Sequence, residues 1–212
     1  IGGYNTMTSS NLITDITQLD ALYGDASPRS LTKEIDALNS QYQSFIEASP
    51  FMAVATVGME GLDCSPRGEQ GSVVRVVDAN TIQFADRRGN NRLDTLRNIV
   101  EDDRIALLFL VPGIGETMRV NGRATISIAP ELIEAFTVDG KSPKTVVEVK
   151  VERVYFQCSK ALVRSGIWDS DIARSFGDVP SAGEMLAATT NDSFDALEYD
   201  RMLEKRYSDE LW

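Results

Sequence analysis

The sequence predicts a mostly β protein, in which short antiparallel strands form a meander that closes towards a barrel, with helices on either side. Three observations support this fold class. Short apolar or alternating stretches recur between residues 51 and 156 at the spacing of a meander. Turn-forming residues such as Gly, Pro, Asn and Asp separate these stretches. Outside them, apolar residues recur at helical spacing.

The chain is expected to have three parts. They are an N-terminal helical segment that packs on the barrel (1–48), the barrel domain (49–168) and a C-terminal helical tail (169–212).

Two helices are expected before the barrel. Apolar residues at helical spacing between residues 13 and 22 predict a short one. Residues 31–48 are predicted as a single second helix, because its apolar side chains form one stripe. Pro50 ends this helix, because a proline disfavours helical backbone in the residue before it.

Six strands are expected, at residues 51–57, 72–77, 81–85, 103–111, 117–128 and 144–156. The first is an unbroken apolar run, which suits a strand buried on both faces. The fifth contains Asn121-Gly122, which we interpret as a bulge within one strand rather than a hairpin turn. Residues 62–68 are interpreted as a segment that leads away from the first strand. The last strand alternates most clearly and suits a barrel wall or a subunit contact.

Further helices are expected after the third strand, at residues 130–137 and in the tail near residues 181–189 and 194–207. Pro130 stands at the first position of its helix, where a missing N–H costs nothing.

Composition excludes several classes of function. The formal net charge of −11 argues against a nucleic-acid partner, and the absence of an 18-residue apolar run argues against a membrane span. There is no histidine, which excludes Ser-His-Asp and Cys-His catalysis, His-bearing zinc sites and His-ligated haem. Acidic pairs such as Asp102-Asp103 lack a convergent metal-binding pattern, so no metal site is expected.

Two cysteines, Cys64 and Cys158, are too few for a disulfide framework. Reduced thiols and the lack of a signal-peptide pattern lead us to expect a cytoplasmic protein. A contact between the two thiols stays open.

An anion site is predicted within residues 82–98. The stretch begins as a strand, breaks at Gly89-Asn90-Asn91 and resumes as a short helix with Leu93, Leu96 and Val100 on one face. The pair Asn90-Asn91 is predicted to cap this helix, whose N-terminus carries a partial positive charge. Three arginines lie within a turn of that end: Arg87, Arg88 and Arg92. Such a combination typically binds phosphate. The alternative, a surface loop with solvated arginines, stays open.

The charge distribution agrees with this prediction. Residues 64–123 hold nine arginines, no lysine and eight acids, a balance of +1, whereas the rest of the chain has a balance of −12. Arginine in preference to lysine favours bidentate binding of phosphate or carboxylate.

Several motifs together resemble the pyridoxamine 5′-phosphate oxidase family of FMN-binding split barrels, in a branch without an assigned reaction. They are SPRG, FADRRGNNRLDTLRN, LFLVPG, TMRVNGRA and YFQCSKALVRSGIW, and the resemblance covers residues 45–168. It implies a six-stranded antiparallel split β-barrel, a homodimer and FMN bound between the subunits.

The resemblance also implies a set of cofactor-binding residues: Ser65, Arg67, Gly68, Phe84, Ala85, Asp86, Arg87, Asn90, Asn91, Arg92, Arg119, Arg164, Ser165 and Trp168. Residues 65–68 would lie on the strand along the flavin, and residues 84–85 would lie at the edge of its ring. Residues 90–92 would bind the phosphate, with Arg67 and Arg87 in reach of it.

The remaining members would complete the site from elsewhere. Arg119 would lie across the barrel, and Arg164, Ser165 and Trp168 would come from the neighbouring subunit. Arg164 and Trp168 are spaced to share one helical face. As an alternative, Trp168 covers the barrel core.

The sequence departs from the biosynthetic oxidase of this family. Asn-Asn-Arg replaces its Arg-Lys phosphate pair, and its C-terminal Arg and His motif is absent because there is no histidine. Gln157 stands where the closer branch has His. The resemblance therefore implies FMN binding without implying oxidation of pyridoxamine phosphate.

The leading hypothesis is an FMN-dependent oxidoreductase that acts on an unidentified small molecule. A flavin-binding protein without turnover, such as a redox sensor, stays open. So does another cofactor in the same fold, either the deazaflavin F420 or a haem ligated by Cys or Tyr. The flavin would carry the redox chemistry.

Overall fold

The computed structural model describes residues 11–175, 179–190 and 194–210. The chain forms two compact units, Ile1–Glu34 and Ile35–Trp212. The first contains α1 (Ile16–Tyr23), capped by the Asp15 carboxylate, which accepts a hydrogen bond from the Gln18 N–H at 2.9 Å. It also contains α2 (Pro28–Thr32). The three-part division expected from the sequence stays a prediction.

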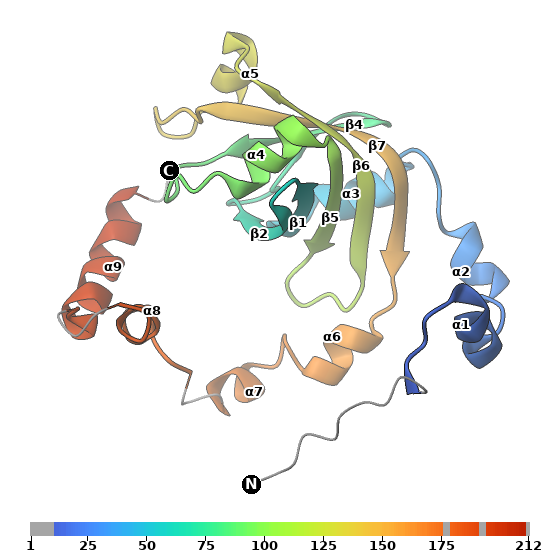
Figure 1. Cartoon of the computed structure of the whole chain (residues 1–212). Helices are drawn as coiled ribbons and strands as arrows, with labels where there is room; N and C mark the ends of the chain where they lie inside the picture. The colour runs from blue at the N-terminus through green and yellow to red at the C-terminus, as the bar shows by residue number, and fades with distance from the viewer. Residues whose placement is uncertain (1–10, 176–178, 191–193, 211–212) are drawn as a thin grey trace, which may run out of the picture. The chain divides into compact units, whose positions relative to one another are not determined.

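The second unit is built on one antiparallel sheet, whose strands run in the order β2-β1-β5-β6-β7-β4-β3 (Figure 1). The strands are β1 (Phe51–Gly58), β2 (Gly61–Gly68), β3 (Arg75–Asp78), β4 (Thr81–Asp86), β5 (Arg104–Leu110), β6 (Thr117–Ser127) and β7 (Thr145–Gln157). The mostly β, antiparallel prediction is therefore confirmed.

The sheet has seven strands where six were expected, and β2 is the additional one. Its sequence, which contains Pro66, was interpreted as a lead-out segment, although the family resemblance implies a strand at residues 65–68. However, β2 is an edge strand, paired only with β1, and a proline is tolerated on an edge because its missing N–H need not join a ladder.

On β1 and β5 the core lies on one face, whereas five consecutive residues of β4 are buried. Met52 and Val54 of β1 are buried and pair with the buried Phe109 and Leu107 of β5. The alternate residues of β1 are only half-buried, so the strand is not buried on both faces as its apolar run had indicated. Small alanines at two of these alternate positions explain why the run looked uniformly apolar.

One continuous strand, β6, crosses the sheet with a register shift between Asn121 and Gly122 opposite β7. The register skips Glu152 of β7 at this point, so one strand with an irregularity at Asn121-Gly122 is confirmed, but the extra residue lies on β7 and not on β6 as predicted. A Cβ added at Gly122 would lie 2.0 Å from the Lys150 carbonyl oxygen. Glycine is thus required here by the close approach of the neighbouring backbone.

The prediction of a single helix over residues 31–48 is wrong. The described chain instead leaves α2 at Thr32 and forms α3 (Ser40–Glu47), with an extended segment between them. Ile35 pairs with Val154 in an isolated β-bridge, which replaces helical hydrogen bonds. Asn39 then caps α3, because its side-chain oxygen accepts a hydrogen bond from the Tyr42 N–H at 2.9 Å.

Six further helices follow in the described chain. They are α4 (Asp94–Glu101), α5 (Pro130–Ala135), α6 (Lys160–Ser165), α7 (Ser170–Ser175), α8 (Ala182–Ala187) and α9 (Ala196–Glu210). Helices α4, α5, α8 and α9 lie close to their predicted positions, whereas α6 and α7 were not assigned as helices. Helices α8 and α9 contact each other, and the Asp200 carboxylate accepts hydrogen bonds from the Ser181 hydroxyl and the Gly183 N–H. Among the described residues, no helix combines the length and apolar character needed to cross a membrane.

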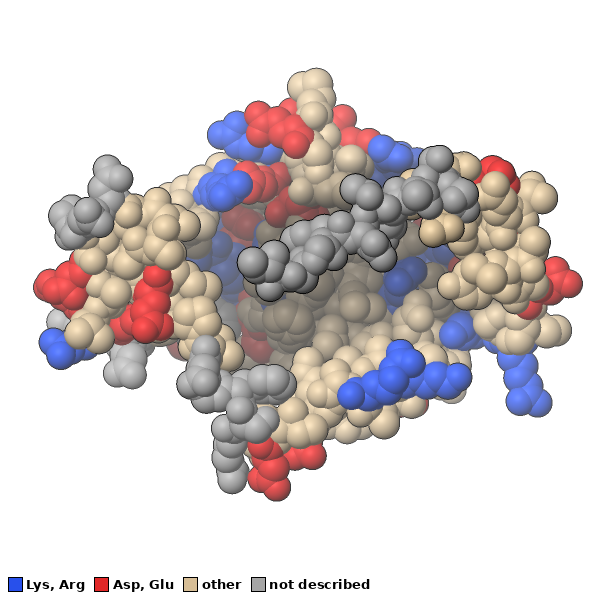
Figure 2. Space-filling view, turned by 60° about the horizontal axis from the view of Figure 1, so that its bottom comes forward, with Lys and Arg blue, Asp and Glu red and all other residues tan. Residues whose placement is uncertain are grey.

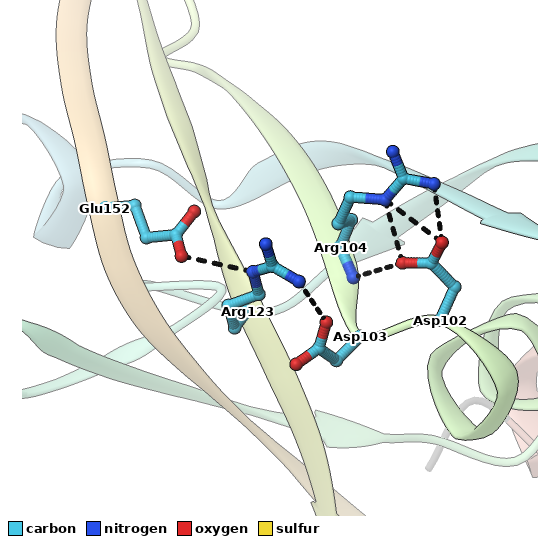
Figure 3. A network of polar contacts seen from close by, with 5 residues as sticks. All are labelled: Asp102, Asp103, Arg104, Arg123 and Glu152. Atoms are coloured by element: carbon cyan, nitrogen blue, oxygen red, sulfur yellow. Dashed lines mark hydrogen bonds and ion pairs between the residues drawn. The ribbon is translucent and has the colours of Figure 1, made fainter.

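Charged residues tie β5, β6 and β7 together at one end (Figure 3). Arg104 and Arg123 stand directly opposite each other in the β5–β6 register, an arrangement that repels. Asp102 binds Arg104, whereas Asp103 and Glu152 bind Arg123 at 2.6 and 3.1 Å. The acids thus compensate two facing cations.

Gly122→Ala is expected to lower the free energy of unfolding by about 1–3 kcal/mol, because the new methyl group would clash with the Lys150 carbonyl. Each kcal/mol corresponds to a melting temperature roughly 2–4 °C lower in a chain of this size. Gly89→Ala is the control, since a Cβ there meets nothing within 4 Å. Calorimetry showing equal melting temperatures for the two variants would contradict the expected clash.

The pKa of the Asp102 carboxyl is lowered from 3.8 to about 2, chiefly by the side-chain hydrogen bonds from Arg104 and next by the Arg104 backbone N–H. A depressed folded-state pKa stabilises the fold above pH 3.8, and this contribution disappears as the pH falls through about 2. Carbon-detected NMR titration of wild type should give that value. Arg104→Met should raise it, whereas Arg75→Met on β3 should not. An Asp102 titration unchanged in Arg104→Met would be incompatible with the assigned cause.

Candidate functional site

One cavity of about 870 Å³ lies beside the edge of β2 and the end of β4. Residues 65–69, Val73, residues 84–96 and residues 141–145 line it. Its volume falls within the range of about 300–1,000 Å³ that is typical of small-molecule and cofactor sites. Pairing of β4 with β7 brings these segments together, because Asp86 is the register partner of Thr145.

The cavity is positively charged, although the chain is acidic overall. Its cations are Arg67, Arg87, Arg88, Arg92, Lys141 and Lys144. Only Glu69, Asp86 and Asp94 among the lining residues are acidic, so the formal balance is +3 in a chain of −11. On the face in Figure 2, by contrast, acidic and basic side chains are interspersed among uncharged residues. The cavity therefore favours an anion.

Ten of the fourteen sequence-predicted site residues line this cavity: Ser65, Arg67, Gly68, Phe84, Ala85, Asp86, Arg87, Asn90, Asn91 and Arg92. The structure thus brings the β2 motif and the loop after β4 to one place. Their role in binding a cofactor stays a prediction.

The other four predicted residues do not line the cavity. Arg119 on β6 donates a hydrogen bond to the Tyr155 hydroxyl at 2.8 Å and lies over its ring. Ser165 ends α6 and donates to the Leu162 carbonyl at 2.9 Å. Trp168 donates from its indole N–H to the Ile114 carbonyl at 2.8 Å. Arg164 also belongs to α6.

Arg164 and Trp168 do not share a helical face as predicted. Helix α6 ends at Ser165, and Gly166 follows in the left-handed conformation with φ = 60°. This residue stops the helix before Trp168, because glycine adopts positive φ without the steric cost that a side chain imposes.

The start of α4 differs from the prediction. Leu93, not the Asn pair, occupies the N-cap position, and no side chain caps the helix. Asn90 instead accepts a hydrogen bond from the Arg92 N–H at 3.0 Å, and Asn91 adopts a positive φ of 59°. The Asn pair therefore shapes the turn, because asparagine tolerates this conformation and binds nearby backbone.

The buried face of α4 also differs from the prediction. Thr95, Asn98 and Ile99 are buried, whereas Val100 is 79% exposed and Leu93 is exposed. Asn98 donates a hydrogen bond to the Thr56 hydroxyl at 3.2 Å, which satisfies a polar group on this face. The apolar pattern misled the prediction because two of the buried positions are polar.

Arg87 joins three segments around the cavity. Its Nε lies 2.6 Å from the Glu69 carboxylate, and one terminal nitrogen donates to the Phe136 carbonyl at 2.7 Å. The side chains of Arg87 and Glu69 are only 16% and 13% exposed. This pairing makes Arg87 mainly a structural residue of the wall.

Arg92, unlike Arg87, is largely exposed to solvent. Its side chain is 78% exposed and its Nε contacts the Asp94 carboxylate at 2.5 Å. An exposed ion pair between near neighbours is weakly held, so its guanidinium can turn towards a ligand at little cost.

Asp86 is a partly desolvated carboxylate between two cations. Burial raises its pKa, while attraction by Arg67 and Lys144 opposes that rise. One terminal nitrogen of Arg67 lies 3.9 Å from an Asp86 oxygen. At the end of β4, the positively charged rim of the cavity therefore adjoins the Asp86 carboxyl group, whose ionised form is disfavoured by burial.

The cavity has an apolar wall and a polar floor. Val73, Phe84 and Ala85 supply buried apolar side chains. The Thr145 hydroxyl oxygen is buried and, among the described residues, has no hydrogen-bond partner. An orphaned buried polar group on a cavity wall is typical of a position where a ligand or water bonds.

The Asp63 carboxylate does not itself line the cavity, but it binds two residues that do. It accepts hydrogen bonds from the Ser65 hydroxyl at 3.0 and 3.1 Å and from the Thr95 hydroxyl at 2.5 Å. Both donors line the cavity. Asp63 thus links β2 to the first turn of α4.

Sequence reasoning missed Lys141, Lys144, Thr145, Asp63 and Thr95. The first three precede or begin β7, which lies 55 or more residues after β4 in the chain, and no motif signals that the two strands pair. Alternation along β2 offered a signal for Asp63, because Asp63, Ser65 and Arg67 share one strand face.

Within the described ranges, no group of three or more Cys, Asp or Glu side chains is arranged to hold a metal ion. Cys64 and Cys158 are both exposed and form no disulfide. The residues that line the site therefore include six cations, three carboxylates, hydroxyl groups and an apolar wall.

Comparisons with known proteins give a family match. A family model described as pyridoxamine 5′-phosphate oxidase matches residues 38–158. No curated protein matches the sequence. Among solved structures, HupZ of Group A Streptococcus is 21% identical with a TM-score of 0.46, over 57% of this chain and 95% of that chain.

Two further solved structures are similar at a comparable level. A Clostridium acetobutylicum protein of the pyridoxinephosphate oxidase family, related to general stress protein 26, is 13% identical with a TM-score of 0.42. It is matched over 56% of this chain and 86% of that chain. A structure named F420 reductase is 17% identical with a TM-score of 0.41, over 57% and 98% of the two chains.

Arg87→Ala is expected to lower the free energy of unfolding by about 2–3 kcal/mol, because it leaves the Glu69 carboxylate and the Phe136 carbonyl without their partner. Urea unfolding measures the change. Arg97→Ala on α4, outside the cavity, should change stability by less than about 0.5 kcal/mol. Adding Glu69→Gln to Arg87→Ala should recover part of the loss, since it removes the buried charge. Equal losses in the Arg87 and Arg97 variants would refute a structural role for Arg87.

Proposed function

The chain belongs to the pyridoxamine 5′-phosphate oxidase family, and from this premise we propose that it is an FMN-dependent oxidoreductase acting on a small molecule. The observation that carries the proposal is the cavity between β2 and the β4–α4 loop, which concentrates six cations in an acidic chain. A phosphorylated cofactor with a flat ring needs such a charge beside an apolar slot.

The cationic rim would hold the phosphate. Arg92 and Lys144 are the residues best suited to it. The former is highly exposed, and the latter forms no hydrogen bond or ion pair within the part of the chain that the structure describes. Arg88 lines the same rim. Arginine adds a planar fork of donors, and lysine adds a point charge.

The wall and floor would hold the ring. Phe84, Ala85 and Val73 would cover an aromatic face. Residues of β2 border the cavity at the edge of the sheet, where one side of the strand has no partner strand. The Thr145 hydroxyl would gain the hydrogen bond that it lacks. Bound FMN would supply hydride and electron transfer, and the protein would set its orientation and potential.

A homodimer is part of the proposal. Arg119, Arg164, Ser165 and Trp168 do not line the cavity, although the resemblance assigns them to the cofactor. Supply of Arg164, Ser165 and Trp168 by a second copy would reconcile the two observations for these three residues, whereas Arg119 would lie across the barrel. Without histidine, the substrate motif of the biosynthetic oxidase is absent, so the substrate proposed is a small molecule other than pyridoxamine phosphate.

Purified protein is expected to be yellow and to release FMN on denaturation, identified by mass spectrometry. Dithionite should bleach it, and a screen with NADH, NADPH and quinones should find rapid turnover. F420 or haem in the extract, or colourless protein that takes up no FMN at micromolar concentration, would overturn the proposal. Bound flavin without turnover would favour a redox sensor instead.

Arg92→Gln and Lys144→Gln should each weaken FMN binding by roughly tenfold, the effect of losing one charged hydrogen bond to phosphate. Fluorescence titration measures this. Binding of riboflavin, which lacks the phosphate, should change little. Arg97→Gln, a matched loss of charge on α4, should leave both affinities intact. Full FMN affinity in an Arg92→Gln, Lys144→Gln double variant would be fatal to the proposed phosphate site.

A further inference from the structure

The hydroxyl of Ser65 is held in one hydrogen-bonding direction. It lies 3.0 and 3.1 Å from the two oxygens of Asp63, on the same face of β2. An ionised carboxylate can only accept, and a serine hydroxyl has one proton to give. That proton is therefore committed to Asp63.

Asp63 itself is fixed from a second element. Thr95, in the first turn of α4 and almost fully buried, donates its hydroxyl proton to the Asp63 Oδ2 at 2.5 Å. The carboxylate is thus held between β2 and α4. It does not line the cavity, whereas Ser65 and Thr95 do.

The consequence is that Ser65 can accept a hydrogen bond from a ligand in the cavity but cannot donate one. With its proton directed at Asp63, the Ser65 oxygen offers only lone pairs to a ligand. A ligand group that donates an N–H or O–H is satisfied there, whereas a carbonyl oxygen at the same place would face lone pairs. Next on the same face, Arg67 presents only donors.

We propose that Asp63 is a positioning residue that makes Ser65 a hydrogen-bond acceptor, so that the cavity selects a ligand edge with an N–H beside a carbonyl. Ser65 accepts from the N–H and Arg67 donates to the carbonyl. This inference rests on the proposed function, because the pyrimidine edge of a flavin has this cyclic imide pattern. It adds the residue that sets the direction of recognition.

The test compares FMN with its N3-methyl analogue, which keeps the phosphate and the ring but lacks the donor. Protein freed of bound flavin is titrated with each, and the ratio of the two dissociation constants is the readout. Wild type should bind FMN about tenfold or more tightly than the analogue, the loss expected when a buried hydrogen bond is left unmade. General damage to the site would weaken both ligands and leave the ratio unchanged.

Asp63→Asn should reduce the ratio to about threefold or less, because the new amide can donate to Ser65 and release its proton towards the ligand. Ser65→Ala should do the same by removing the acceptor. Ser65→Thr should retain the wild-type ratio, since it keeps a hydroxyl. Asp103→Asn, the same change in an acid that binds Arg123 away from the cavity, should also retain it. Asparagine has nearly the same size as aspartate, so Asp63→Asn does not enlarge the cavity. Relief of a steric clash with the methyl group of the analogue therefore cannot produce its effect.

Two results would overturn the inference while leaving FMN binding intact: equal affinity of wild type for both ligands, or a wild-type ratio in Asp63→Asn. Absence of FMN binding by wild type would instead overturn the proposed function, and this inference with it. The two failures are therefore distinguishable.

Discussion

The ion pair between Arg87 and Glu69 holds the cavity together. Glu69 follows β2, Arg87 follows β4, and the same guanidinium reaches the Phe136 carbonyl beyond α5. Three segments distant in sequence thus meet on one side chain. Because both partners are largely shielded from water, the pair is less screened than a surface contact, and neither charge can be left alone without cost. Glu69 therefore fixes one of the six cations of the cavity in its wall.

The same loops illustrate what sequence can and cannot reveal about this site. Motifs on β2 and after β4 were found because each is local, and both reach the cavity. Lys144 and Thr145 were missed because only the pairing of β4 with β7 brings them there. The fold class and the position of the irregularity at Asn121-Gly122 could be predicted from periodicity and turn residues, although the extra residue lies on the partner strand β7. The residue pattern alone did not identify strand β2, which contains a proline, whereas the family resemblance placed residues 65–68 on a strand.

Helices were mispredicted where polar side chains, rather than apolar ones, determine the packing. Asn98 and Thr95 are buried on α4, where they donate hydrogen bonds to Thr56 and Asp63. Of the predicted apolar stripe, Leu93 and Val100 are exposed and only Leu96 packs against the core. Likewise, Ile35 leaves the helical pattern because its backbone pairs with Val154. Tertiary hydrogen bonds outweighed local propensity in both cases.

Because the chain has no histidine, the side chains that can accept and donate protons at the cavity include carboxylates and hydroxyls but no imidazole. Two carboxylates serve the cavity in different ways. Asp63 accepts two hydroxyl protons and so orders donors and acceptors on the floor. Asp86 lines the rim, where burial raises its pKa against the pull of Arg67 and Lys144. An anion bound to those two cations would weaken their hold on Asp86 and favour its protonation. The charge of the ligand and the protonation of the site are therefore coupled.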